Sequence, residues 1–99
     1  MALPHRYLLV SFTWRGTPKI QELEPFFAQA TDWLRYAPNC WIVWTSGTPQ
    51  SWATGARRHL GSEDSLLVVE INAKAKEGWQ ADWIWAWLNK VRPEPLGRL

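Results

Sequence analysis

Residues 6–14 read RYLLVSFTW, and this run predicts the strand around which the rest of the chain folds. Side chains alternate between the two sides of a strand, so the stretch from Tyr7 to Thr13 has two distinct faces. One face carries Leu8, Val10 and Phe12, and the other carries Tyr7, Leu9 and Ser11. Both faces are mainly apolar, which indicates a strand that has to be covered on both sides.

The segments that follow alternate between helix and strand. The run CWIVWTS over 40–46 and the run SLLVVEIN over 65–72 are rich in β-branched or aromatic residues, which is typical of buried strands. Helical periodicity is expected over three stretches, residues 24–37, 49–60 and 79–91. We expect the first helix to begin near Glu24, because Pro25 is tolerated in a first turn but costs about 3 kcal/mol inside a helix.

The composition indicates one small domain in a reducing compartment. The chain has 99 residues, a net charge of +2 and a single cysteine, Cys40, which is expected to be a buried structural residue. No apolar segment reaches the roughly 20 residues that a bilayer span needs, and the first residues lack the pattern of a signal peptide. We therefore expect a cytoplasmic domain over residues 1–92, followed by a flexible tail over 93–99.

Strands with two apolar faces and three helices indicate an α+β fold in which helices pack one face of a small sheet of three to four strands. The other face needs cover from the terminal helix or from a second copy of the chain. The terminal helix is expected to dock through Trp79, Trp83, Ile84, Trp87, Leu88 and Val91. Trp85 falls on its polar side and is assigned to self-association. We expect a homodimer whose interface includes Tyr7, Leu9 and Trp85.

Several stretches together resemble the small bacterial proteins described as SinR-like. They are YLLVSF, EPFFAQA, WIVWT, HLGSEDSLLVVEI and a late Trp followed by WL, and they cover most of residues 6–88. The most specific is EDSLLVVEI, in which an acidic turn leads into a strand. That family is similar to the ferredoxin-like small CRISPR adaptation nucleases and to the virulence-associated protein D ribonucleases. The resemblance implies a ferredoxin-like fold, a homodimer joined through sheet edges and faces, and nucleic acid as a partner.

The resemblance also indicates where nuclease chemistry would lie. In the nuclease branch, an Asp after an aromatic residue at the end of the first strand holds a divalent metal between two subunits. The matching residues here are Phe12 and Thr13, and a hydroxyl is a poor ligand for a hard divalent cation. We therefore expect no catalytic residue, no metal and no cofactor. The alternative is a metal-dependent endoribonuclease that uses Glu63, Asp64 or Glu70 instead.

The other polar residues have simpler structural interpretations. Asp64 is expected to cap backbone N–H groups in a turn, and Glu70 is expected to be an edge charge that discourages strand addition. His5 and His59 lack the spacing of a zinc site, and His59 is expected near a helix C-terminus. No nucleophile motif or glycine-rich phosphate loop is present in the sequence.

Four arginines are the candidates for nucleic-acid contacts: Arg6, Arg15, Arg57 and Arg58. In a dimer, Arg6, Arg15 and Lys19 would line a shared basic groove, with Trp14 as a stacking surface; a scattered, solvated set of surface charges is the simpler interpretation. Arg57 and Arg58 would combine with Trp52, although Trp52 falls on an apolar stripe and packing in the core is the simpler interpretation. The sequence thus predicts a non-catalytic homodimer with an interaction or nucleic-acid-associated role.

Overall fold

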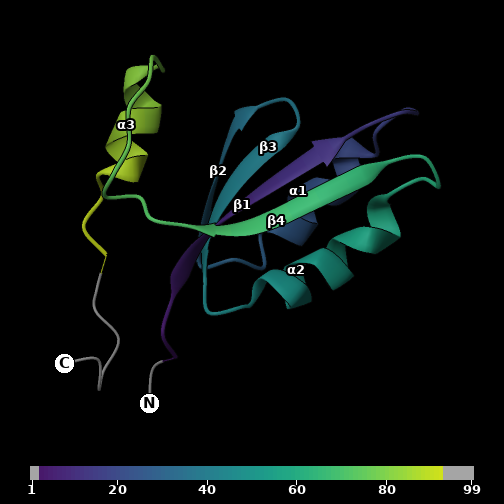
Figure 1. Cartoon of the computed structure of the whole chain (residues 1–99), viewed down its shortest axis with the longest axis horizontal. Coiled ribbons are helices and arrows are strands. Elements are labelled where there is room, and N and C mark those ends of the chain that lie inside the picture. Colours follow the sequence, from purple (N-terminus) through teal and green to yellow (C-terminus); the bar gives the residue numbers. More distant parts are fainter. Residues whose placement is uncertain (1–2, 93–99) are drawn as a thin grey trace.

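The computed structural model describes residues 3–92 and contains one antiparallel sheet of four strands with helices on both sides (Figure 1). In chain order the elements are β1 (Arg6–Thr13), α1 (Ile20–Phe27), β2 (Asp32–Ala37), β3 (Cys40–Thr45), α2 (Pro49–Ala56), the 3-10 helix η1 (Arg57–His59), β4 (Ser65–Ile71) and α3 (Asp82–Leu88). The strands lie in the order β2-β3-β1-β4, which confirms the predicted α+β class. The tail expected over 93–99 lies outside the described residues. Between residues 3 and 92, no helix has the length and apolar character needed to cross a membrane.

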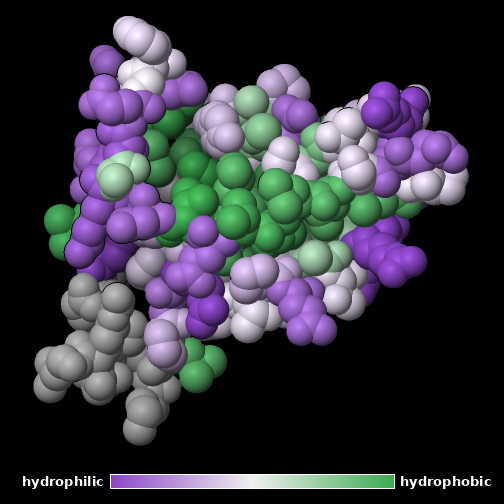
Figure 2. Space-filling view, in the orientation of Figure 1, coloured by the Kyte–Doolittle hydropathy of each residue, from purple (hydrophilic) through white to green (hydrophobic). Residues whose placement is uncertain are grey.

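The two faces of the sheet are covered unequally. On the face under α1 and α2, β1 contributes three fully buried side chains, Leu8, Val10 and Phe12. On the other face α3 inserts Ile84, which packs with Leu34 of β2. Beyond α3 this second face stays open, since Leu67 is 61% exposed and Val69 is 40% exposed. Figure 2 shows the result as an apolar band across the strands beside α3. The terminal helix therefore provides only part of the expected cover.

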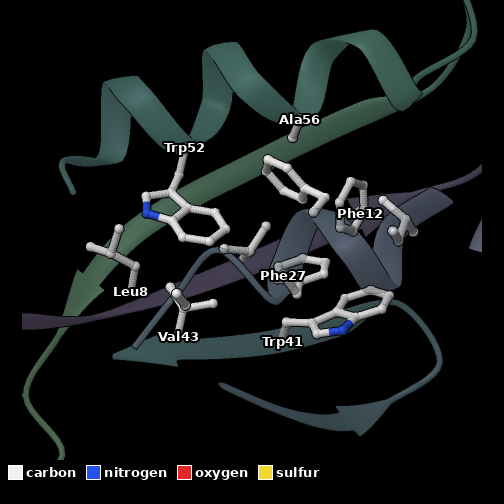
Figure 3. Close-up of a cluster of buried hydrophobic side chains, with 11 residues drawn as sticks. Leu8, Phe12, Phe27, Trp41, Val43, Trp52 and Ala56 are labelled. Atoms are coloured by element: carbon white, nitrogen blue, oxygen red, sulfur yellow. The ribbon is translucent and has the colours of Figure 1, made fainter. Parts of the chain in front are cut away.

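The larger core, between the sheet and the first two helices, is built from aromatic rings (Figure 3). The rings of Phe27 and Trp41 stack with their centroids 4.5 Å apart, and Phe12 meets Trp41 edge-on at 5.4 Å. From α2, the buried Trp52 donates its indole N–H to Thr45 Oγ1 at 3.3 Å. Aromatic pairs of this kind add about 0.5–1.5 kcal/mol each beyond the area they bury. The cluster holds the two helices against the central strands.

The first helix begins earlier than predicted. It starts at Ile20 and ends at Phe27, with Pro25 inside it. Pro25 has no N–H, so the helix loses one internal hydrogen bond. Little more than one turn precedes Pro25, which limits the damage to the start of the helix. Burial of Leu23 and Phe27 offsets this cost, because each places a large apolar side chain in the core.

The prediction of a helix through residues 32–37 was wrong, because this stretch is strand β2. Trp33 packs against the larger core while its neighbour Leu34 packs on the α3 side. Adjacent apolar residues are compatible with a helix, but they also suit a strand that is covered on both faces. The Pro38–Asn39 turn allows β2 to pair with β3, and this pairing satisfies the backbone of both strands.

The last helix is shorter than the predicted 79–91 and runs from Asp82 to Leu88. Three residues expected to dock are exposed instead: Trp79 (98%), Trp83 (57%) and Val91 (92%). Gly78 has φ +150°, a conformation that favours glycine, so the chain is not helical where it enters this segment. Trp85, expected on the polar side, is half-buried.

Candidate nucleic-acid interface

The four candidate arginines lie at two ends of the sheet. Arg6 opens β1 and Arg15 follows its end, and a strand of eight residues at about 3.3 Å per residue spans about 23 Å. Arg57 and Arg58 belong to η1, which leads into the turn that ends at Asp64. The Asp64 carboxylate accepts the N–H of Arg15 at 2.7 Å, so this turn and the loop after β1 are in contact. Arg15, Arg57 and Arg58 therefore share one end, and Arg6 lies at the other.

Asp64 organises the loops at the arginine-rich end. Its Oδ1 accepts the N–H groups of Arg15 and Gly16, at 2.7 and 3.4 Å, and its Oδ2 accepts the N–H of Gly61 at 2.7 Å. The hydrogen bonds from Arg15 and Gly61 hold the pKa of Asp64 below its ordinary value. The predicted capping role is confirmed. Both oxygens of this carboxylate are engaged in fastening two loops together.

The residues considered as metal ligands do not come together in the structure. Thr13 is exposed at the end of β1, and Glu63 is exposed in the turn before β4. Glu70 lies on edge strand β4, as predicted, with Oε1 3.7 Å from Arg6 Nη1. Among the described residues, no three His, Cys, Asp or Glu side chains are grouped so that they could hold a metal ion.

The two histidines and the cysteine make local contacts. His5 Nε2 is 2.8 Å from Thr31 Oγ1, and His59, at the end of η1 as expected, places Nδ1 3.1 Å from Glu22 Oε1. Cys40 was expected to be buried but is only half-buried, at the start of β3. Burial raises the pKa of the Tyr36 hydroxyl to about 12, and a hydrogen bond to Cys40 together with the negative charge of its thiolate form adds to this shift.

The two tryptophans paired with arginines in the sequence are used by the core. Trp52 is only 7% exposed, which confirms that it packs in the core. Its ring is therefore not accessible for stacking with a base beside Arg57 and Arg58. Trp14 stacks on Phe12 with centroids 4.6 Å apart and an angle of 8° between the rings. One face of the Trp14 indole is thus covered by the protein itself.

A groove that the sequence did not reveal lies at the Arg6 end. It is a cavity of about 610 Å³ between the start of β1, the segment that leaves β4 and the end of α3. Its cationic lining consists of Arg6, Lys74, Lys76, Lys90 and Arg92, and Glu70 is its one carboxylate among the described lining residues. Figure 2 shows hydrophilic side chains gathered around α3 beside the apolar band. The groove attracts anions, because the cations outnumber the carboxylate.

Arg92 forms the inner wall of this groove and is held in place. Its side chain is 10% exposed; Nη1 donates to Asp32 Oδ2 at 2.6 Å and Nε donates to Tyr7 Oη at 3.1 Å. The guanidinium also lies over the Trp87 ring, 4.7 Å from its centroid. Burial is the largest single influence on the pKa of Asp32 and would raise it, but the hydrogen bonds from Arg92, Trp87 and the Trp33 N–H, together with the Arg92 charge, outweigh burial and lower this pKa. Arg92 therefore ties α3 to β1 and β2. The lysines add further positive charge to the groove, and Lys90 lies 3.4 Å from the same Asp32 oxygen.

Two of the residues expected at the dimer interface, Tyr7 and Leu9, differ in how far α3 covers them. Tyr7 packs against Trp44 at 4.6 Å and Trp87 at 5.9 Å, and so lies beneath α3 in this chain. Leu9 lies opposite Val69 in the register between β1 and β4 and belongs to the same face of the sheet. Leu67, Val69 and Leu9 together form the apolar band beside α3. Sequence reasoning named Leu9 but missed the two β4 residues, whose alternation with Leu66 and Val68 was the available signal.

Comparisons of the chain with protein-family models, with curated proteins and with solved structures found no match.

Proposed function

We propose that the chain is a ferredoxin-like domain that works as a homodimer and acts by binding nucleic acid in the cytoplasm, not by catalysis. Two features support the fold assignment. The elements from β1 to β4 follow the order strand, helix, strand, strand, helix, strand, and the sheet order is β2-β3-β1-β4 with antiparallel neighbours. The resemblance of EDSLLVVEI and WIVWT to SinR-like proteins points the same way.

The apolar band carries the proposal of a homodimer. Leu67 and Val69 project from a regular strand and yet are 61% and 40% exposed, which is unfavourable for large aliphatic side chains in water. The band consists of Leu9, Leu67 and Val69 and has no charged side chain that would select a different protein by charge complementarity. A second copy of the chain can cover the band, because an apolar patch around a two-fold axis is complementary to itself.

The charge distribution supports nucleic acid as the partner. The net charge is only +2, but the cations gather at the two ends of the sheet. Phosphate binding by such patches depends on counterion release, so affinity falls steeply with salt. In a dimer, each end is present twice, and two weak contacts on one strand would reinforce each other.

A metal-dependent endoribonuclease is the second hypothesis, and it has less support. Thr13 stands where the nuclease branch has an Asp, and the oxygens of Asp64 are bonded to backbone N–H groups. Calorimetric titration with Mg²⁺ and Mn²⁺ separates the hypotheses: a defined binding heat, together with metal-dependent RNA cleavage, would favour the nuclease.

The proposed function is tested by sedimentation of the purified full chain at low salt, alone and with short single- and double-stranded RNA and DNA. We expect the mass of a dimer, and a faster species when nucleic acid is added. A dimer that ignores all four nucleic acids would leave an interaction with another protein as the better account. A monomer at micromolar concentration would remove the dimer from the proposal.

A further inference from the structure

We infer that the groove at the Arg6 end is a site for single-stranded nucleic acid, with phosphates on Lys74, Lys76 and Lys90 and bases stacked on Trp79 and Trp83. This inference rests on the proposed function and names the site and the kind of strand. It assigns binding to the end of the sheet opposite Arg15, Arg57 and Arg58.

The lysines supply the positive charge of the groove that is left over for a ligand. Asp32 is already bonded to Arg92 at 2.6 Å, so Lys90, at 3.4 Å from the same oxygen and 60% exposed, is a second cation on one carboxylate. Arg6 lies 3.7 Å from Glu70 Oε1 and is partly neutralised. Lys76 donates to the backbone O of Ala73 at 2.8 Å, which holds its ammonium at the groove without neutralising it. The surplus positive charge is thus carried mainly by Lys74, Lys76 and Lys90.

Exposed indoles lie on the segment that continues from the groove. Lys74 and Lys76 precede Trp79 in the segment between β4 and α3, and Trp83 lies in the first turn of α3. Trp79 is 98% exposed and Trp83 is 57% exposed, although the other ring systems of the chain are largely used in packing. Trp83 and the groove-lining Leu88 are five residues apart on α3, a rise of about 7.5 Å. A chain of nucleotides leaving the groove along α3 therefore meets free aromatic faces.

The combination favours single strands over duplexes. Bases in a duplex are stacked on each other and cannot lie on an indole, whereas a single strand presents free faces of every base. Lysines beside exposed aromatic rings are the usual elements of a surface that binds single strands with little sequence preference. A duplex would contact the same lysines through its phosphates alone.

The test measures the affinity of the full chain for a labelled 12-nucleotide single strand and for a 12-base-pair duplex, by fluorescence anisotropy across a salt series. Lys74→Ala with Lys90→Ala should weaken binding of both, and for the single strand it should reduce the salt slope by about 0.7 for each phosphate that is no longer neutralised. Trp79→Ala with Trp83→Ala should weaken binding of the single strand by about thirtyfold or more and leave binding of the duplex unchanged. For comparison, Arg57→Ala with Arg58→Ala removes the same charge from the opposite end; it should weaken both probes by the same factor, and by less than the lysine variant does.

The outcomes separate this inference from the proposed function. Equal affinity for both probes, with no effect of the tryptophan variant, would overturn the single-strand site while nucleic-acid binding stands. Loss of affinity in the Arg57 and Arg58 variant alone would move the site to the other end. Binding of neither probe would refute the proposed function itself, and tryptophan-dependent binding to anionic phospholipid vesicles in its place would assign the indoles to a membrane surface. Competition by a free mononucleotide at equal nucleotide concentration would show that a strand is not required.

Discussion

Replacing Arg92 with Ala should loosen α3 from the sheet. The side chain is 10% exposed and its guanidinium contacts Asp32, Tyr7 and the Trp87 ring. Removing one member of a buried ion pair costs about 3–5 kcal/mol, because the other charge is left without its partner. Asp32 keeps 27% exposure and has Lys90 at 3.4 Å, which relieves part of that penalty. We therefore expect the free energy of unfolding to fall by about 2–3 kcal/mol.

Urea unfolding followed by far-UV circular dichroism gives this free energy, and hydrogen exchange reports whether α3 has lost protection before the sheet does. Lys90→Ala is the matched control. It removes a cation from the same Asp32 oxygen, but its side chain is 60% exposed, so the loss should stay within about 0.5 kcal/mol. If Arg92→Ala is as stable as Lys90→Ala and α3 exchanges as in the unmodified chain, Arg92 is not the anchor of this helix.

Three further predictions test the dimer face, a buried hydroxyl and the start of α1. Leu67→Glu places a charge in the apolar band and should give a folded monomer by sedimentation. The control is Thr54→Glu, at an exposed position of α2 away from the band; if both variants form the same dimer, this face is not the interface. The pKa of Tyr36 is raised from 10.0 to about 12, so the folded chain holds this proton longer than the unfolded chain. The stabilisation that comes from this raised pKa is complete below pH 10 and is lost as the pH rises to 12. Tyr36→Phe removes the hydroxyl, so the free energy of unfolding should fall less over that interval. An unchanged pH profile of stability would contradict the assigned pKa shift. Pro25→Ala restores a backbone N–H inside α1 and should raise the free energy of unfolding, measured by urea titration, by about 1–2 kcal/mol. A less stable variant would mean that Pro25 does not destabilise this helix.

The sequence predicted the parts of the fold in which one pattern dominates. The alternation of Leu8, Val10 and Phe12 with Tyr7 and Leu9 assigned both faces of β1 correctly. β3 and β4 were also identified, because β-branched runs between turn residues have few other interpretations. α2 begins at Pro49 as predicted, after an N-cap at Thr48.

The errors came from segments that fit two periods at once. Trp33 and Leu34 lie on opposite faces of a sheet that is apolar on both sides, so their spacing also suited a helix. Trp79 and Trp83 continued the apolar stripe of α3, but no partner among the described residues is placed to bury them. Both decisions depend on tertiary packing that a local pattern does not contain.

The candidate site was even harder to predict from the sequence than the fold. Arg92 and Asp32 are 60 positions apart, and only the packing of α3 on the sheet brings them together. The lysines of the groove come from one loop and one helix end, with no spacing that relates them. The basic residues that stood out as neighbours, Arg57 and Arg58, lie at the opposite end. What the sequence could supply was the sign of the charge, not its location.

The most direct test of the central claim is sedimentation velocity of the full chain with a 12-nucleotide single strand at low and at high salt. We predict a dimer that sediments with the strand at low salt and releases it at high salt. A monomer that sediments independently of the strand under both conditions would contradict both the homodimer and its binding of nucleic acid.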